Sequence, residues 1–81
     1  MRKHYVYILK CADGKLYTGY TVDPRARIKL HNLGKASKFT RSRLPAYLVH
    51  LERFYSKSKA LRRESEIKKM PRNHKLKICA V

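Results

Sequence analysis

The segment His4–Cys11, HYVYILKC, constrains the fold more than any other part of this chain. It is rich in β-branched and aromatic residues, which favour β-strands, and its apolar side chains fall on both faces of an extended backbone. A strand that is apolar on both faces has to be covered from both sides, so the segment predicts a central strand. Leu16–Thr21 predicts a second strand, joined to the first by the turn Ala12–Gly14.

The length of this turn decides which side chains share a face. In a three-residue loop, Gly14 would adopt the left-handed conformation of a β-bulge and Cys11 would pair with Lys15, whereas a two-residue turn would shift the pairing by one residue. A shift of one residue turns every side chain to the opposite face. We favour the bulged loop, because it sets the ring of Tyr7 opposite Gly19, which has no side chain to compete for that space.

A helix is expected after the second strand. Asp23-Pro24 predicts its N-cap and first residue, and the helix should run to about Asn32, with Gly34 as its stop. The polar and basic stretch Leu33–Ala46 that follows predicts a loop closed by a proline.

The rest of the chain predicts one further strand and two helical segments. Tyr47–Tyr55 is the expected third strand, and Ser58 is expected to cap a helix that runs to about Lys69. Pro71 should break that helix or start the next one, and His74–Val81 predicts a short helical tail. Taken together, the order predicts one α+β domain over residues 1–81, with a small three-stranded antiparallel sheet flanked by helices.

The first helix places two functional candidates side by side. At about 100° per residue, Ala26, Leu30 and Leu33 form the expected apolar stripe. Arg27 and His31 lie one turn apart at its edge. Considered without their context, they are best explained as a solvated arginine and a histidine near the negative end of a helix.

The second helix places a carboxylate on an apolar face. Its expected buried stripe consists of Ala60, Leu61 and Ile67. Glu64 falls within that stripe, whereas Glu66 points away from it. A carboxylate in such a position is costly unless it is paired or bound to a metal. The spacing leaves both explanations open: an ion pair with Lys68, four residues on, or a metal ligand.

The net charge of the chain indicates which class of partner it binds. The 81 residues include 21 Lys and Arg against 5 Asp and Glu, for a formal net charge of +16 that is spread along the whole chain. Such an excess favours a polyanion partner, most simply nucleic acid. Cys11 and Cys79 have no metal-site spacing, and no apolar run approaches the length of a membrane span. We therefore expect a cytoplasmic protein with buried or incidental thiols and with no membrane partner or small-molecule cofactor.

The ordered set of these motifs resembles the GIY-YIG endonuclease superfamily, and in particular its small stand-alone YhbQ-like branch. Tyr5-Val6-Tyr7 stands where the family has GIY, and Tyr17-Thr18-Gly19 stands where it has YIG. TVDPRARIKLHNLGKA matches the family helix with its arginine and following histidine, and SKSKALRRESEIKKM matches the helix with the metal-binding glutamate. The resemblance covers the chain from Tyr5 to about Leu76.

The resemblance implies hydrolysis of phosphodiester bonds with Mg²⁺ or Mn²⁺ as the cofactor. Glu64 would be the metal ligand, and Arg27 would hold the phosphate where negative charge develops. Tyr17 would take a proton from the attacking water, with His31 as a rival base, and Tyr7 would orient water or the phosphate.

A basic segment after the first helix is the candidate nucleic-acid clamp. Gly34–Arg43, GKASKFTRSR, would hold backbone phosphates with its cations, and its phenylalanine would stack on a base. The candidate residues are Lys35, Lys38, Phe39, Arg41 and Arg43. As substrate we expect nucleic acid, with structured or branched DNA favoured over RNA. Two other classes remain open: a catalytically inactive nucleic-acid-binding module, and a small basic RNA-associated protein of the ribosomal type.

Overall fold

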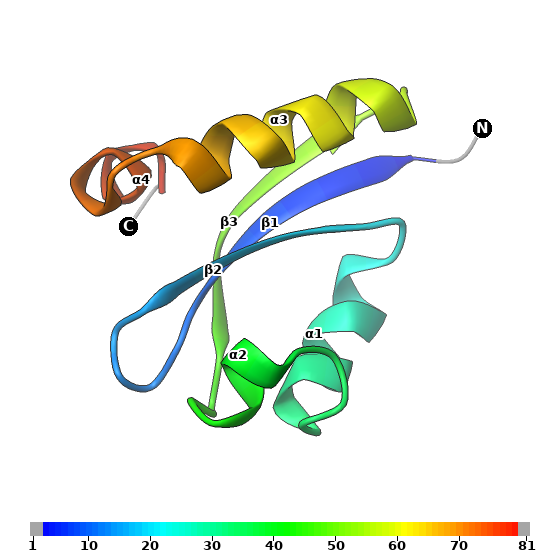
Figure 1. Ribbon diagram of the computed structural model, residues 1–81. Helices are drawn as coiled ribbons and strands as arrows, with labels where there is room; N and C mark the ends of the chain where they lie inside the picture. Colours follow the sequence, from blue (N-terminus) through cyan, green and yellow to red (C-terminus); the bar gives the residue numbers. More distant parts are fainter. Residues whose placement is uncertain (1–2, 80–81) are drawn as a thin grey trace.

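The computed structural model describes residues 3–79 and has an α+β architecture (Figure 1). Its elements are β1 (His4–Lys10), β2 (Leu16–Thr21), α1 (Pro24–Asn32), α2 (Lys38–Arg41), β3 (Tyr47–Phe54), α3 (Lys57–Lys69) and α4 (Arg72–Ile78). The three strands form one antiparallel sheet in the order β2–β1–β3. The predicted fold class is therefore confirmed.

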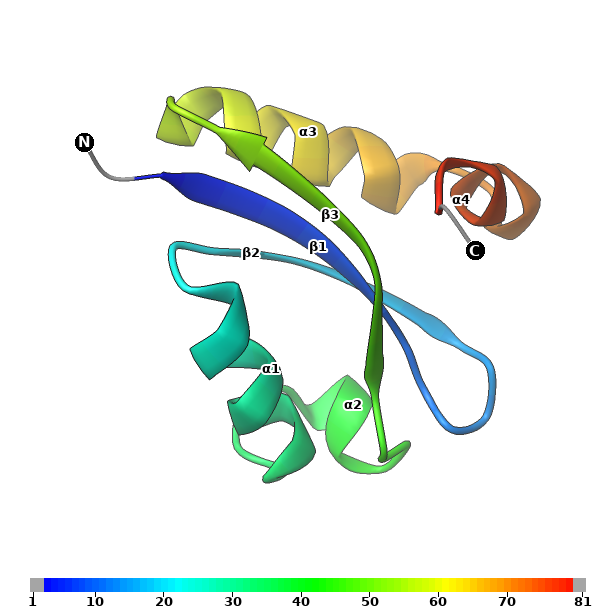
Figure 2. The same ribbon diagram turned by 180° about the vertical axis from the view of Figure 1, so that it is seen from behind.

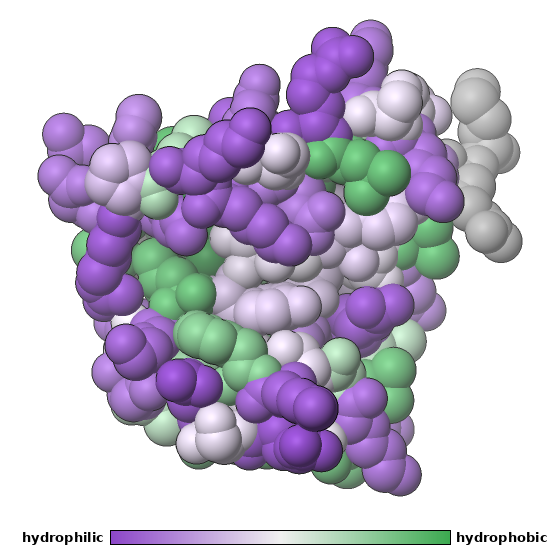
Figure 3. All heavy atoms as spheres, in the orientation of Figure 1, coloured by the Kyte–Doolittle hydropathy of each residue, from purple (hydrophilic) through white to green (hydrophobic). Residues whose placement is uncertain are grey.

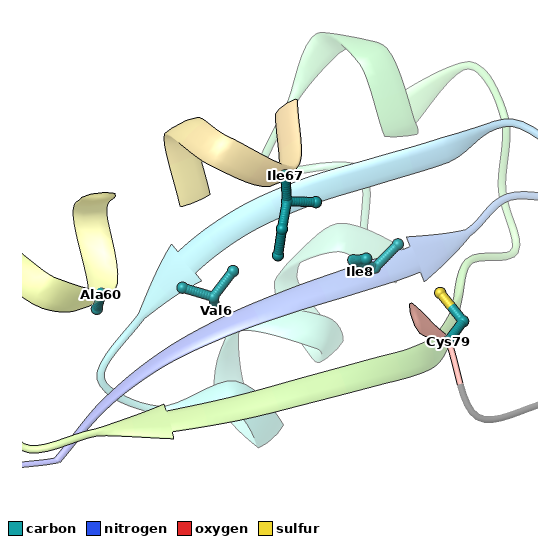
Figure 4. Close-up of a cluster of buried hydrophobic side chains, with 5 residues drawn as sticks. All are labelled: Val6, Ile8, Ala60, Ile67 and Cys79. Carbon is teal, nitrogen blue, oxygen red and sulfur yellow. The ribbon is translucent and has the colours of Figure 1, made fainter. Parts of the chain in front are cut away.

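β1 is the central strand, and both of its faces are buried. On one face, Val6 and Ile8 pack under α3 with Ala60 and Ile67 (Figure 4). On the other face, Tyr7 and Leu9 belong to a second buried cluster, with Cys11 and Ala46. Figures 1 and 2 show α3 and α4 on one side of the sheet and α1 and α2 on the other. The alternation of side chains along β1 thus provides two cores from a single strand.

The β1–β2 hairpin has the predicted bulged loop. The amide of Cys11 donates to the carbonyl of Lys15 over 2.8 Å, and Gly14 has a φ of +86°. In the resulting register Tyr7 lies opposite Gly19, as expected. A side chain at Gly14 would be strained, because L-residues rarely adopt positive φ.

The ends of α1 also follow the prediction. The Asp23 carboxylate caps the helix by accepting from the amide of Ala26 over 3.2 Å, and Pro24 is the first helical residue. Gly34, with a φ of +76°, turns the chain away after Asn32.

The predicted apolar stripe of α1 is wrong. Leu30 and Leu33 are 40% and 57% exposed, whereas His31 is 1% exposed. The helix instead turns Ile28 and His31 toward the cluster around Tyr7. The physical reason is that hydrogen bonds to both ring nitrogens make burial of His31 acceptable, which a hydrophobic pattern cannot anticipate.

A short helix, α2, lies inside the segment that we predicted to be a loop. The Ser37 hydroxyl accepts from the amide of Phe39 over 3.1 Å and caps the helix. Thr40, within it, is fully buried. The segment therefore packs against the domain as an ordered element.

The start and the buried face of α3 differ in detail from the prediction. Ser56, and not Ser58, is the N-cap, because its hydroxyl accepts from the amide of Lys59 over 3.4 Å. Leu61 is 41% exposed and lies outside the stripe of Ala60 and Ile67. The helix ends at Lys69, as predicted.

The tail after α3 is helical, as expected, but its helix begins earlier than predicted. α4 starts at Arg72, directly after Pro71, and ends at Ile78. Residues 80–81 of the predicted tail lie outside the described part of the chain. No helix within residues 3–79 is long and apolar enough to cross a membrane. Cys11 and Cys79 are buried free thiols, and burial raises the pKa of both.

An ion-pair network fixes α3 on β3. Arg63 donates to both carboxylate oxygens of Glu52, over 2.9 Å from Nε and 3.1 Å from one of its terminal nitrogens, and His50 lies 2.6 Å from the same carboxylate. Burial alone would raise the pKa of Glu52, but the hydrogen bonds from Arg63 and His50 outweigh it and lower that pKa. This network holds α3 against β3 at Arg63, the residue directly before Glu64.

Candidate active site

The candidate site lies along β2, where the two helical layers approach the same edge of the sheet. Figure 1 shows β2 crossing between α3 above and α1 and α2 below. Figure 3, in the same orientation, shows a paler band across the middle of this face, bordered by hydrophilic side chains. β2 contributes Tyr17 and Gly19, α1 contributes Arg27 and His31, and α3 contributes Glu64.

Tyr7 and His31 are joined by a buried hydrogen bond. The Tyr7 hydroxyl lies 2.8 Å from Nε2 of His31, and Nδ1 of the same ring lies 2.8 Å from Oγ1 of Thr40. Thr40 in turn donates to the carbonyl of Ser37 over 3.4 Å. Four residues from β1, α1 and the start of α2 therefore form one continuous chain of hydrogen bonds.

The direction of this chain defines the tautomer of His31. Because the Thr40 hydroxyl donates to Ser37, it accepts from Nδ1–H of His31, which leaves Nε2 as an acceptor for the Tyr7 hydroxyl. Burial, and to a lesser degree the charge of Arg27, lower the pKa of His31 and favour this neutral form. Both ring nitrogens are thus occupied, so His31 holds Tyr7 in place and is poorly placed to contact a water directly.

Tyr17 lies beside this chain in an aromatic cluster. Its ring centroid is 5.0 Å from that of His31, 6.3 Å from that of Tyr7 and 6.0 Å from that of Phe39. The side chain is half-buried and comes from the strand at the edge of the sheet. The two tyrosines therefore share one face of the hairpin, as the bulged register requires.

Arg27 and Glu64 have opposite electrostatic effects on the Tyr7 hydroxyl. Burial raises the pKa of Tyr7 well above its ordinary value, and the neighbouring Tyr17 and Glu64 raise it further, whereas the positive charge of Arg27 acts in the opposite direction. Arg27 lies on α1 and Glu64 on α3, in layers on opposite sides of the sheet. The hydroxyl of Tyr7 is therefore within the electrostatic reach of one cation and one anion from separate elements.

Glu64 has the ion-pair partner that its spacing suggested. Its Oε2 lies 3.4 Å from Nζ of Lys68, and the Glu64 side chain is 18% exposed while that of Lys68 is 56% exposed. A pair whose cation is largely in water contributes little to stability. Glu66, by contrast, points outward, as predicted, and contacts Arg63 over 3.4 Å.

The predicted clamp residues fall into two groups. Lys35, Lys38 and Arg41 are exposed. Arg43 is held within the domain, because its Nε lies 3.1 Å from Asp13 and its Nη1 donates to the carbonyl of Phe39 over 2.8 Å. Its guanidinium carbon also lies 4.2 Å from the centre of the Phe39 ring. Arg43 therefore covers one face of the phenylalanine that we expected to stack on a base.

Sequence reasoning missed Thr40, which orders the site without taking part in any recognised motif. The available signal was local: Ser37 three residues before Thr40 is typical of a helix cap followed by a hydroxyl that bonds back to the cap. His31, whose Nδ1 is the hydrogen-bond partner of Thr40, lies nine residues before it in the sequence. Only the packing of α2 on α1 brings the two together.

Comparison with known proteins identifies the family to which the chain belongs. Residues 3–77 match the family described as the GIY-YIG catalytic domain, so the chain belongs to that family of nuclease domains. Within the family, it groups with the UPF0213 proteins. It is 58% identical over 78 residues to a UPF0213 protein of Staphylococcus haemolyticus, covering 96% of this chain and 95% of that protein. A UPF0213 protein of Staphylococcus aureus is 50% identical over the same share of each chain.

Two solved structures have folds similar to that of this chain. The solution NMR structure of a UPF0213 protein from Bacillus halodurans has a TM-score of 0.61 and 51% identity, covering 93% of this chain and 80% of that one. The solution NMR structure of a protein from E. faecalis has a TM-score of 0.63 and 35% identity, covering 94% of this chain and 82% of that one. The fold of this domain is therefore shared with both solved structures.

Proposed function

We propose that this protein is a metal-dependent endonuclease that hydrolyses phosphodiester bonds in nucleic acid, with structured or branched DNA as its substrate. The arrangement that supports this most directly is the packing of Tyr7, Tyr17 and His31, whose ring centroids lie 5.0 to 6.3 Å apart. Arg27 and Glu64 act on one hydroxyl from opposite layers of the domain. A positive group for the phosphate and a negative group for a metal, placed around hydroxyls, are the components that phosphodiester hydrolysis needs.

The donor set around Glu64 fits Mg²⁺ or Mn²⁺. Within residues 3–79 no three His, Cys, Asp or Glu side chains cluster as a metal cage. Mg²⁺ does not require such a cage, since it keeps several waters and binds through one or two carboxylates together with phosphate oxygens. Glu64, mostly buried and near the tyrosines, would hold the ion. Once bound, the metal would supply charge stabilisation for the phosphate and the leaving oxygen.

The remaining residues would have separate roles. Arg27 would bind the non-bridging phosphate oxygens and stabilise the negative charge that develops on them. Tyr17, half-buried at the sheet edge, would act as the base through its phenolate oxygen, which takes a proton from the attacking water after the hydroxyl proton has passed to solvent. Tyr7, whose hydroxyl is hydrogen-bonded to Nε2 of His31, would orient that water through its oxygen lone pairs. Lys35, Lys38 and Arg41 would position the nucleic-acid backbone.

A second candidate function is nucleic-acid binding without catalysis. The contact that favours it is the ion pair of Glu64 with Lys68, which gives the carboxylate a partner other than a metal. Both functions predict binding that weakens as salt rises, because both depend on the net charge of +16. Cleavage that requires the metal distinguishes them.

The decisive experiment is a nuclease assay with a matched pair of variants. Labelled linear and branched DNA and RNA are incubated with the protein in Mg²⁺ or Mn²⁺, and in EDTA. Glu64→Gln should abolish cleavage and leave binding intact. Glu66→Gln, which removes the same charge from an exposed position of the same helix, should cleave like the parent.

Two outcomes would count against the proposal. Cleavage by Glu64→Gln at the parent rate would overturn the assignment of Glu64 as metal ligand. A parent protein that binds the substrates but cleaves none of them would favour the inactive binding module.

A further inference from the structure

We propose that Lys15, Arg72 and Lys75 form a phosphate-binding subsite that holds the backbone of one nucleic-acid strand beyond the cleavage position. These residues lie outside the basic segment Gly34–Arg43 and outside the set around Tyr7. The inference rests on the proposed function only in taking nucleic acid as the ligand.

The three cations line one cleft. It has a volume of about 250 Å³ and is bounded by Lys15 and Leu16 from the hairpin, Phe39 from α2, and Arg72 and Lys75 from α4. Figure 3 shows apolar surface between the regions of α4 and α2, bordered by hydrophilic side chains. The cleft thus combines an apolar wall with a positively charged rim.

Contact between α4 and the hairpin brings the cations together. Nη2 of Arg72 lies 3.9 Å from the position that a Cβ would occupy on Gly14, the residue before Lys15. Arg72 therefore reaches across the β1–β2 loop, and Lys75 lies one helical turn further along α4. The bulged loop and the helix together define the opening.

The positive charge in this cleft is not neutralised by the described part of the protein. None of the ion pairs found within residues 3–79 includes Lys15, Arg72 or Lys75. Asp13 is the acidic residue nearest to Lys15 in the sequence, but both of its carboxylate oxygens already have partners. One oxygen lies 3.1 Å from Nε of Arg43, and the other accepts from the backbone amide of Lys15 over 3.1 Å. Three cations around one opening, without a carboxylate partner, favour an anionic ligand.

The cleft lies beside the candidate active site. Phe39 lines it, and the ring of Phe39 lies 6.0 Å from that of Tyr17. Lys15 and Tyr17 are two positions apart on the hairpin, about 6.8 Å along the strand direction. Charges along one nucleic-acid strand recur about every 3.4 Å of helix axis, so the same strand can reach both residues.

The cleft is small. About 250 Å³ is below the range of roughly 300–1,000 Å³ typical of sites that enclose a drug-sized ligand. It can hold one sugar-phosphate unit against Leu16 and Phe39, with the cations around the phosphate. The geometry therefore places a backbone contact one or two nucleotides from the bond that would be cut.

The test compares two double variants with equal loss of charge. Arg72→Gln with Lys75→Gln alters the cleft, and Lys59→Gln with Arg62→Gln alters exposed cations of a different helix, α3. Binding of a labelled single-stranded oligonucleotide is measured in EDTA over a range of salt concentrations. Circular dichroism checks that each variant is folded.

The cleft variant should lower the slope of log affinity against log salt by about 0.7, since the cleft holds one phosphate and one phosphate contact on a single strand contributes about 0.7. The α3 variant should keep the parent slope. Lys15→Gln, on a different element, should lower the slope by about 0.7 and tests the same cleft without altering α4. Equal slopes for the two double variants would overturn the subsite.

The binding measurement separates the subsite from the proposed nuclease. If the parent cuts no substrate but the slopes differ as expected, the subsite stands and the nuclease proposal fails. If metal-dependent cleavage is found and the slopes are equal, the nuclease stands and the subsite fails.

Discussion

Tyr7 and Gly19 face each other across β1 and β2, and the ring of Tyr7 fills the space that a side chain at Gly19 would need. A Cβ at Gly19 would lie 2.5 Å from Cζ of the ring. Tyr7 has no room to move aside, because it is buried and bonded to His31. The absence of a side chain at one position therefore fixes the location of a hydroxyl at another.

Gly19→Ala should therefore lower the free energy of unfolding by about 1–3 kcal/mol through overpacking. Urea denaturation measures this loss. In a Tyr7→Leu background, where the ring is absent, the same substitution should cost less. An equal cost in both backgrounds would show that the two residues do not compete for space.

Arg27→Ala should slow cleavage about 10²–10³-fold, because one electrostatic donor to the phosphate is lost. Single-turnover cleavage at saturating protein is the appropriate measurement. Arg25→Ala is the matched control, since it removes the same charge from an exposed position on the same helix. If the two variants cleave equally fast, Arg27 has no specific role in the chemistry.

Tyr17→Phe should reduce turnover while leaving stability close to that of the parent, because it removes only the hydroxyl of a half-buried ring. His31→Ala should reduce stability as well, since it leaves the buried Tyr7 and Thr40 hydroxyls without their partner. Cleavage rates and urea denaturation of both variants test this difference. Parent-like turnover of Tyr17→Phe would show that the Tyr17 hydroxyl is not the base.

The buried His31 should make the domain less stable in acid. Its folded pKa is lowered, while in the unfolded chain a histidine titrates near 6.5. The unfolded state therefore binds the proton first, and the free energy of unfolding should fall as the pH decreases from about 6.5 through the folded pKa. His31→Gln should weaken this dependence, whereas His74→Gln, at an exposed position, should retain it. Identical pH profiles for the two variants would contradict the prediction.

Two threonines of β2 should respond in opposite ways to the same substitution. Within the described residues, the buried Oγ1 of Thr18 has no hydrogen-bond partner, so Thr18→Val should raise the free energy of unfolding by about 1 kcal/mol. Oγ1 of Thr21 accepts from the amide of Asp23 over 3.1 Å and donates to its carbonyl over 3.3 Å. Thr21→Val should therefore lower that free energy by a similar amount, and thermal denaturation of both variants tests the contrast.

The sequence predicted the hairpin well because its signals are local. Gly14 allows the bulge, and Gly19 gives the register a packing reason. Asp23-Pro24 and Gly34 likewise define the ends of α1 through contacts within a few residues. The hairpin bulge and the ends of α1 are each determined by residues within a few positions, so the sequence pattern was sufficient to predict them.

The buried face of α1 and the role of Arg43 could not be obtained in this way. His31 is buried because Thr40 and Tyr7, from two other elements, satisfy its ring nitrogens. Arg43 is withdrawn from the clamp because Asp13, from the hairpin loop, lies beside it. Polar groups that depend on distant partners look like surface residues in a sequence, and only tertiary packing shows otherwise.

The alternation of side chains along β1 has a consequence for cooperativity. Val6 and Ile8 belong to the core beneath α3, whereas Tyr7 and Leu9 belong to the core beneath α1. Neither core can form while β1 is disordered, so both should be gained and lost in the same unfolding transition. A cavity made at Ile67 would therefore reduce the fraction of molecules in which Tyr7 is in place, although the two side chains lie on opposite sides of the sheet.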